Sequence, residues 1–393
     1  MKASANGAPV RVLFVESNTE LGGAQMALLT LLGHLDRGRV CPFFSCLGFG
    51  EGDMPSLVER LGVPVHRMPP GRFRSLPATM RKIARLRELI RVHGIDVVFS
   101  NGGHAVLYAQ PAARLTQRLC AWWVHGYCPV DPMKGHPIAL AELFLQSDLL
   151  LANSRFTAET LHKVLPERGT IPLLRCGVDL RRHRPDAEAG AAARHAEGLG
   201  PEELVVGIFG RLQPWKGQHL LLQAAGQLAR RGVVPRFLVV GGSVFGLDPG
   251  YGRQLKRLAL AAGLNAAVRF LGQRTDVNAL MNGCDLVVHA SVEAEPWGLV
   301  VAEAMAAGRP VVAAAAGGPL EMIQHGVNGW LVPPGDPAAL AASLEYLLAR
   351  PELRARLGEA AQVHAAENFG AKHAAQILTR ELCSARERRA RFG

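Results

Sequence analysis

Short apolar runs alternate with longer helical stretches along the first half of the chain. We predict six buried strands over residues 10–15, 40–47, 62–66, 96–99, 121–124 and 149–152, and helices over 23–35, 76–92 and after Ser154. Apolar runs of this length, separated by helices, are typical of parallel strands that are covered on both faces. The pattern therefore predicts a doubly wound α/β sheet.

The same alternation restarts near residue 204. We predict strands over residues 204–209, 236–240, 268–271, 286–290 and 311–314, and helices from 218, over 252–262, over 299–307 and from about 337 to 388. Between residues 179 and 201 a basic run is followed by an alanine-rich, weakly patterned segment. A segment of this kind indicates a connection between two domains.

The two halves predict an α/β fold of two facing Rossmann-like, doubly wound domains with an interdomain cleft. We expect the domains at residues 1–185 and 201–371, with a linker over 186–200. Such folds bind ligands at the carboxyl ends of their strands, so we expect the chemistry to lie there.

Composition excludes several classes of protein. The 393 residues are 49% hydrophobic and 20% charged, which excludes a disordered protein. No uninterrupted apolar stretch is long enough to predict a membrane-spanning helix, and no apolar segment before residue 10 suggests a secretory signal. Seven cysteines without a C-x-x-C pair suggest neither a zinc site nor a disulfide framework, and indicate reduced thiols in a cytoplasmic protein.

The net charge leaves the kind of partner open. The 44 Lys and Arg residues against 33 Asp and Glu residues give a formal charge of +11. Nucleic acid, an anionic membrane surface and phosphorylated small molecules all remain compatible with this excess.

The segment from residue 295 to 310 carries the richest chemistry. Pro296 and Gly298 delay the helix, so Glu295 is expected on the loop and Glu303 about one turn inside the helix. The amide groups of residues 298–300 would meet anionic oxygens at the helix N-terminus, while the carboxylates would accept hydrogen bonds from hydroxyl groups. A nucleotide sugar presents this combination of groups. The alternative is one helix-start acid and one surface acid.

Three other strand ends carry candidate groups. Arg211 and Lys216 follow a strand on a loop rich in glycine and proline, where cations can clamp a diphosphate. This loop matches neither the Walker A pattern nor G-x-G-x-x-G. Gly22 and Gly23 form either a phosphate-binding turn or a plain tight turn. His125 places an imidazole at a strand end, where a structural or solvated histidine is the alternative.

These motifs resemble glycosyltransferase family 4, whose members are retaining enzymes of the GT-B fold. The E-x7-E pair lies in E-P-W-G-L-V-V-A-E-A-M-A-A-G-R-P-V-V-A, which is similar to the family signature. Four further stretches are similar: G-G-A-Q at 22–25, G-V-D at 177–179, G-R-L-x-P-x-K-G at 210–217, and the glycine-rich segment from 317 to 336. Two positions depart from the family pattern, since Trp297 replaces the usual Phe and Cys176 the usual Asn.

The resemblance implies a role for each matching residue. Arg211 and Lys216 would hold the donor diphosphate, Glu303 the ribose hydroxyls and Glu295 a hydroxyl of the donor sugar. His125 would sit beside that sugar near the reacting carbon. The residues lining the phosphates would be Gly22, Gly23, Gly298, Leu299 and Val300 next to Trp297, and those bordering the base Gln273 and Arg274. A C-terminal helix over about 372–393 would pack back on the first domain.

The resemblance also implies a mechanism. A hexosyltransferase of this family moves a sugar from a UDP- or GDP-sugar by front-side attack, and the leaving phosphate takes the proton of the acceptor. No D-x-D motif is present, so we predict no metal and no cofactor, with Arg211 and Lys216 stabilising the leaving group. We do not assign Glu295 as a nucleophile.

The acceptor and the partners remain open. We predict a hydroxyl acceptor in cell-surface polysaccharide or glycolipid assembly. The alternatives are a small soluble natural product or a non-catalytic nucleotide-sugar-binding subunit. A basic run could touch an anionic membrane on the inner face, but an ordinary solvated helix face is the preferred interpretation. Its members are Arg72, Arg74, Arg81, Lys82, Arg85, Arg87 and Arg91. Nucleic acid is disfavoured because no recognition motif accompanies the charge.

Overall fold

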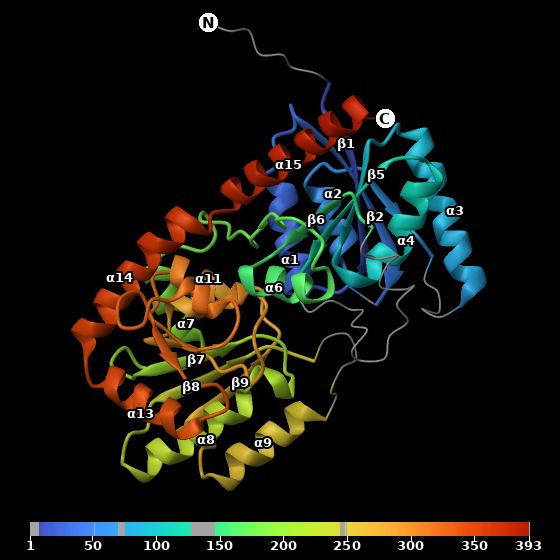
Figure 1. Cartoon of the computed structure of the whole chain (residues 1–393). Coiled ribbons are helices and arrows are strands. Elements are labelled where there is room, and N and C mark those ends of the chain that lie inside the picture. The colour runs from blue at the N-terminus through green and yellow to red at the C-terminus, as the bar shows by residue number, and fades with distance from the viewer. Residues whose placement is uncertain are drawn as a thin grey trace, which may run out of the picture. The chain divides into compact units, whose positions relative to one another are not determined.

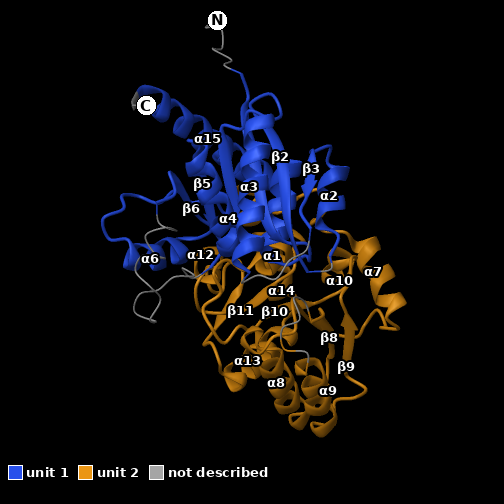
Figure 2. Ribbon diagram, turned by 90° about the vertical axis from the view of Figure 1, so that its right-hand side faces the viewer, with its two compact units in different colours: residues 1–177, 371–393 blue, residues 178–370 orange. Residues whose placement is uncertain are grey.

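The chain folds into two compact units. In the computed structural model they comprise residues 1–177 with 371–393, and residues 178–370 (Figure 2). The structure describes residues 8–50, 52–69, 75–126, 146–243, 248 and 250–392. No helix in these ranges is long and apolar enough to cross a membrane.

The first unit is a six-stranded parallel sheet covered by helices on both faces. Its strands are β1 (Val10–Asn18), β2 (Val40–Phe49), β3 (Val65–Arg67), β4 (Val97–Asn101), β5 (Leu119–Val124) and β6 (Leu149–Ala152). Its helices are α1 (Gly23–Gly33), α2 (Met54–Arg60), α3 (Leu76–Val92), α4 (Gly102–Leu115), α6 (Arg155–Val164) and α15 (Ala371–Phe392) (Figure 1). The sequence pattern does not predict α4, because Gly102 and Gly103 open it and Pro111 lies inside it.

The second unit repeats this architecture. Its strands are β7 (Val205–Phe209), β8 (Arg236–Val240), β9 (Val268–Gly272), β10 (Leu286–His289), β11 (Val311–Ala314) and β12 (Trp330–Val332), all parallel. Its helices are α7 (Ala187–Ala196), α8 (Gln218–Arg230), α9 (Tyr251–Ala261), α10 (Val277–Asn282), α11 (Leu299–Ala306), α12 (Pro319–Met322), α13 (Pro337–Leu348) and α14 (Pro351–Asn368). The pattern does not predict β12, which is only three residues long.

Both sheets reverse their strand order at one point. The first sheet runs β3-β2-β1-β4-β5-β6 and the second β12-β11-β10-β7-β8-β9, so each has the order 3-2-1-4-5-6 counted from its own first strand. The switch points lie between β1 and β4 and between β7 and β10. Doubly wound sheets bind ligands outside the carboxyl ends of their strands at such points. The topology confirms the predicted fold class of two doubly wound domains.

The predicted linker over residues 186–200 is wrong, because most of it is helix α7 of the second unit. The Asp186 carboxylate accepts a hydrogen bond from the Ala189 amide at 2.9 Å and caps the helix. A Cβ atom at Gly190 would lie 2.7 Å from the Asn282 carbonyl oxygen, so α7 packs closely on α10. Alanine is the strongest helix former, which explains the helix that the weak apolar pattern does not reveal.

The predicted final helical stretch is also divided. It forms α13, α14 and α15, which are separated at residues 349–350 and 369–370. The helix α15 belongs to the first unit, where it packs against α1 (Figure 1).

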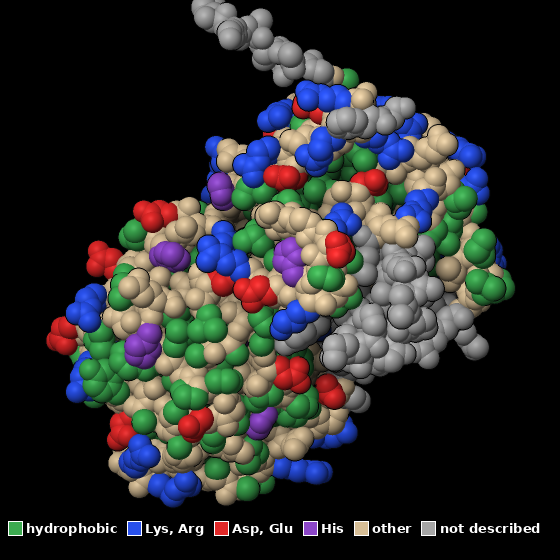
Figure 3. Space-filling view, in the orientation of Figure 1, with side chains coloured by type: hydrophobic (Ala, Val, Ile, Leu, Met, Phe, Trp, Pro, Cys, Tyr) green, Lys and Arg blue, Asp and Glu red, His purple; other side chains and the backbone are tan. Residues whose placement is uncertain are grey.

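Basic side chains are prominent on the first unit near the end of α15 (Figure 3). Arg386 donates to the Ala8 carbonyl oxygen at 2.8 Å, and Arg389 donates to that of Gln117 at 2.8 Å. These two charges therefore fasten α15 to its own unit.

The basic helix α3 spans the predicted residues 76–92, but one of its basic side chains is not on the surface. Lys82 is buried, where it donates to the carbonyl oxygens of Leu47 and Pro69. Counting it in a basic surface was therefore wrong, while Arg81, Arg85 and Arg91 remain exposed. Arg72 and Arg74 lie outside the described residues.

The cysteines in the described ranges form no disulfide, and four of the six are buried. Cys128 lies outside those ranges.

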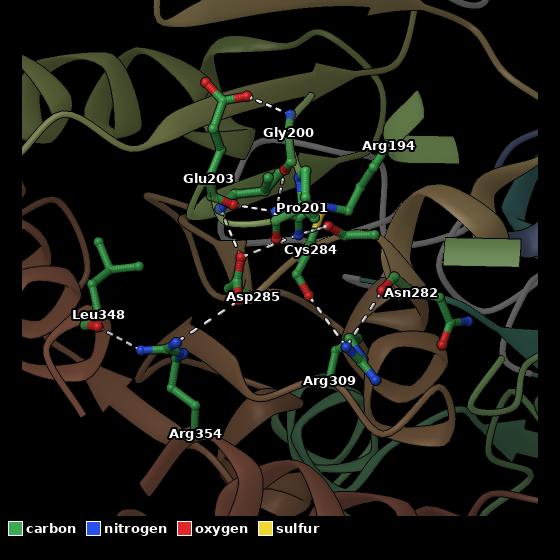
Figure 4. Close-up of polar contacts among 12 residues, drawn as sticks. Arg194, Gly200, Pro201, Glu203, Asn282, Cys284, Asp285, Arg309, Leu348 and Arg354 are labelled. Carbon is green, nitrogen blue, oxygen red and sulfur yellow. Dashed lines mark hydrogen bonds and ion pairs between the residues drawn. The ribbon is translucent and has the colours of Figure 1, made fainter. Parts of the chain in front are cut away.

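A polar network lies at the amino ends of the central strands β7 and β10 of the second sheet (Figure 4). Asp285, just before β10, accepts from the Val205 amide at 2.8 Å and from Arg194 at 3.4 Å, and it lies 3.8 Å from Arg354. Arg194 comes from α7 and Arg354 from α14. The Asp285 carboxylate thus links the amino ends of β7 and β10 to helices α7 and α14.

Replacing Asp285 should destabilise the second unit. In Asp285→Ala, two partly buried guanidinium groups lose their counterion, so we expect a loss of about 2–3 kcal/mol in the free energy of unfolding. The matched control is Glu345→Ala, which removes an ion pair to Arg231 whose side chains are 39% and 45% exposed. The control should change stability by less than about 1 kcal/mol. Calorimetry of the full chain measures both, and equal effects would contradict the assignment.

Candidate functional site

The site of the second unit is built from the loops that follow β7 and β10. The loop after β7 ends in a short 3-10 turn, Pro214–Lys216, and the Trp215 carbonyl oxygen accepts from the Val292 amide at 2.8 Å. Gly217 has φ of 72°, and a Cβ atom there would lie 1.8 Å from the Ala290 carbonyl oxygen. Only glycine permits this approach, which holds the two loops together.

A buried ion pair lies where these loops meet. Lys216 donates a hydrogen bond from Nζ to Oε2 of Glu295, and the same oxygen lies 3.1 Å from Nε2 of His289 and accepts from Ser291 Oγ at 3.3 Å. The Lys216 ammonium also lies 4.0 Å from the centre of the Trp215 ring. The three contacts converge on one oxygen of Glu295.

The charges of this cluster stabilise one another. Burial raises the pKa of Glu295, but the Lys216 charge and the His289 hydrogen bond outweigh it and hold that pKa well below its usual range. Burial lowers the pKa of Arg211, and the negative charge of Glu295 opposes this effect. Glu295 is therefore an ionised carboxylate beside two cations, Arg211 and Lys216.

Two glycines fix the backbone of Glu295. The Gly318 amide donates to the Glu295 carbonyl oxygen at 2.7 Å. Gly317 has φ of 71°, and a Cβ atom there would lie 2.2 Å from the same oxygen. The glycine-rich segment from 317 to 336 therefore holds the backbone of Glu295 in place, and with it the position of the carboxylate.

Helix α11 begins beside this cluster. Gly298 is its N-cap with φ of 93°, and the Leu299 and Val300 amides have no partner within the helix. They can therefore donate to an anion, as predicted for residues 298–300.

Glu303 lies one turn into α11 and faces His183. Its Oε1 is 3.7 Å from Nε2 of His183, and both side chains are largely buried. Burial raises the pKa of Glu303 to about 7, and burial with the charge of Arg182 lowers the pKa of His183 to about 4. Near neutral pH, Glu303 therefore carries a partial negative charge beside a neutral imidazole.

Three predicted donor contacts lie apart from this cluster. The Trp297 ring is 2% exposed and packs edge-on against Phe369, so its side chain serves the core. The Arg274 guanidinium binds Glu197 at 2.8 Å and Asp276 at 2.6 Å. Gln273 is exposed. Contacts of Gln273 and Arg274 with a base remain predictions.

The first unit carries its candidate groups at its own switch point. Gly22 is the N-cap of α1, and its amide donates to the Gln25 side chain at 3.1 Å. Gly23 follows as the first residue of that helix. The His125 ring lies just beyond β5, with Nε2 2.7 Å from Asn101 Oδ1.

Four further residues of these clusters are not predicted from the sequence: His183, His289, Ser291 and Asn101. His289 and Asn101 are the last residues of β10 and β4, so their position at carboxyl ends was the available signal. In the described ranges, no group of three or more His, Cys, Asp and Glu side chains could hold a metal ion.

Two family models match the chain. Residues 21–182 match the model described as Glycosyltransferase Family 4, and residues 191–364 match Glycosyl transferases group 1. A curated relative, the D-inositol 3-phosphate glycosyltransferase of Salinispora arenicola, is 36% identical over 244 residues, which are 59% of this chain and 54% of that protein. The chain thus spans about half the length of the curated relatives it matches.

Solved structures share the whole fold. Anabaena Alr3699/HepE, solved in complex with UDP and glucose, has a TM-score of 0.82 at 27% identity and covers 95% of this chain and 100% of its own. Its complex with UDP-glucose has the same TM-score at 28% identity, covering 95% and 99%. A glycosyltransferase from Rickettsia africae has a TM-score of 0.83 at 18% identity, covering 98% and 100%, which shows the fold alone.

The two glutamates should affect stability in opposite directions. The folded chain binds the Glu303 proton more tightly, with a pKa near 7 against 4.5, so this residue costs stability as pH rises through that interval. Glu303→Gln cannot ionise, so its free energy of unfolding should exceed that of the wild type by about 2–3 kcal/mol at pH 8 and by little at pH 4.5. Glu295→Gln leaves Lys216 buried without its counterion and should lose stability at both pH values. Unfolding curves at the two pH values test this, and a loss for Glu303→Gln at pH 8 would contradict it.

Proposed function

We propose that this chain, which belongs to glycosyltransferase family 4, is a hexosyltransferase that moves a sugar from a nucleotide diphosphate sugar to a hydroxyl acceptor. The observation that carries the proposal is the buried Lys216–Glu295 pair beside Arg211 and the open N-terminus of α11. Two cations, free amides and an ionised carboxylate at one switch point match the phosphates and hydroxyls of such a donor.

The cations would act on the leaving group. As the bond between the anomeric carbon and the phosphate oxygen breaks, negative charge grows on the diphosphate. Arg211 and Lys216 would stabilise that charge, and Lys216 is already held in place by Glu295 before the donor arrives. Lys216 has three N–H donors, so it can keep its bond to Glu295 while it binds a phosphate oxygen.

We expect transfer to proceed without added divalent metal, with activity retained in EDTA.

The carboxylates would position the donor. The contacts of Glu295 converge on Oε2, which leaves Oε1 to accept from a sugar hydroxyl. We infer that Glu295 binds a sugar hydroxyl rather than attacking the anomeric carbon. The acceptor would then attack from the front side, with retention of the anomeric configuration. Glu303 would accept from the ribose hydroxyls.

We favour a UDP-sugar as donor. The structures of Alr3699/HepE, at 27% and 28% identity over its whole length, contain UDP with glucose and UDP-glucose. A GDP-sugar is the alternative within the same site.

For the acceptor, we propose a lipid-linked or polysaccharide hydroxyl, with the chain peripheral on the inner face of the membrane. Support comes from α3, where Leu76 and Met80 are 71% and 56% exposed close to Arg81 and Arg85. Apolar side chains beside basic ones suit an anionic lipid surface. The curated relatives named for D-inositol 3-phosphate favour a second candidate, a small phosphorylated polyol.

The donor can be identified by thermal shift. In a panel of UDP-, GDP- and ADP-sugars, we expect a UDP-sugar to raise the melting temperature most. Lys216→Gln keeps a donor group for Glu295 but loses the positive charge, so the shift should shrink and kcat/KM should fall about 100-fold or more. Lys256→Gln, at an exposed lysine of α9, is the matched control. Near-wild-type transfer by Lys216→Gln would overturn the site assignment.

Membrane contact can be tested by flotation with anionic vesicles. The wild-type chain should float at low salt and be released at high salt. Reversing Arg81, Arg85 and Arg91 to Glu should abolish flotation. The control reverses Arg253, Lys256 and Arg257, three exposed basic residues of α9 in the second unit. No binding at low salt would reject the membrane proposal and favour a soluble acceptor.

A further inference from the structure

A buried polar chain lies at the switch point of the first sheet. Glu16 on β1 is paired in register with Asn101 on β4, and the two side chains are 0% and 2% exposed. Asn101 in turn is paired with Trp123 on β5, two residues before His125. The topology thus places Glu16, Asn101 and His125 in a row across three adjacent strands.

The neighbours of Asn101 determine the orientation of its amide. Its Nδ2 lies 2.6 Å from Glu16 Oε2 and 3.2 Å from the Ala24 carbonyl oxygen. A carbonyl oxygen accepts only and a carboxylate is an acceptor, so the nitrogen of the amide must face them. The remaining oxygen, Oδ1, therefore faces His125.

This orientation sets the tautomer of His125. Oδ1 of Asn101 can only accept, so the ring nitrogen at 2.7 Å, Nε2, must carry a proton. The other ring nitrogen, Nδ1, lies 3.7 Å from the Cys176 sulfur and can accept from its thiol. Both ring nitrogens are then engaged by the chain itself.

The far end of the row is also fixed. Glu16 Oε1 accepts from the Asn18 amide at 2.9 Å and from Ser17 Oγ at 3.1 Å. Burial raises the pKa of Glu16, and these hydrogen bonds oppose the increase. Burial also lowers the pKa of His125 to about 3. Among the described residues, the Cys176 thiol contacts the His125 ring, and the Cys46 thiol interacts electrostatically with Glu16.

We propose that Asn101 and Glu16 are positioning residues, which hold His125 as a neutral imidazole protonated at Nε2. In this state Nε2 is bound to Asn101 and Nδ1 faces the Cys176 sulfur, so neither ring nitrogen is left to take the proton of the acceptor. In the transfer, the bond from the anomeric carbon to phosphate breaks, the bond to the acceptor oxygen forms, and the acceptor proton passes to the leaving phosphate oxygen. The tautomer follows from the first unit alone, whereas its part in transfer rests on the proposed function.

The test is a nitrogen-15 spectrum of the full chain with labelled histidines. The chain has 14 histidines, so the His125 signals are assigned by their loss in His125→Gln. From pH 5.5 to 8.5, we expect one neutral tautomer with the proton on Nε2 and constant shifts. A proton on Nδ1, or titration of this ring between pH 6 and 8, would overturn the proposal in the wild-type chain.

Variants test each link of the row. Asn101→Leu removes the acceptor, so the Nε2–H tautomer should no longer dominate, and kcat should fall at least tenfold. Glu16→Leu removes the acceptor of the Asn101 amide, so it should release that amide and weaken the preference of His125 for the Nε2–H tautomer. Asn328→Ala is the control, since Asn328 is a similarly buried asparagine of the second unit and should leave the His125 spectrum unchanged.

The outcomes separate this proposal from the proposed function. An unchanged His125 tautomer in Asn101→Leu would refute the positioning role, whatever the activity. If the spectra are as expected but no nucleotide sugar raises the melting temperature, the proposed donor is refuted and the positioning role stands. The signals of the other histidines report whether each variant is folded.

Discussion

The reversal of strand order in each sheet is the constraint on which the rest of this structure depends. At a reversal, the connections from two neighbouring strands leave in opposite directions, so their carboxyl ends are not covered by a helix. Groups at those ends are drawn together although they are far apart in sequence. Lys216 and Glu295 meet across β7 and β10, as Glu16 and Asn101 do across β1 and β4. Both clusters follow from one topological rule.

The two switch points differ in their electrostatics. The second unit gathers ionised groups, in which a carboxylate is matched by the cations Lys216 and Arg211. The first unit instead joins one buried carboxyl group, an amide and an imidazole by directional hydrogen bonds. A charged cluster suits phosphate binding, whereas a chain of fixed hydrogen bonds suits the holding of one ring in one orientation.

The sequence predicts strands better than it predicts the contacts of the site. Continuous apolar runs mark most of the strands, because both faces of a parallel sheet are buried. The sequence pattern does not predict α4, because glycine and proline are poor helix formers. It does not predict α7 either, because an alanine-rich segment is compatible with both a helix and a linker. Glu295, Lys216 and Glu303 are found through local motifs. The glutamate partners His289 and His183, and the His125 partner Asn101, are single residues whose contacts depend on tertiary folding that a local motif does not encode.

The division of the first unit has a consequence for synthesis. Its strands are complete by residue 177, but α15 joins them only from residue 371, after the entire second unit. Among the side chains whose burial is described, Leu378 and Leu382 are the last large apolar groups of this core, and both are fully buried. On the ribosome, the apolar surface that α15 covers therefore stays exposed while the intervening 193 residues, 178–370, are made and can fold. The second unit, which is continuous in sequence, can be complete before the first.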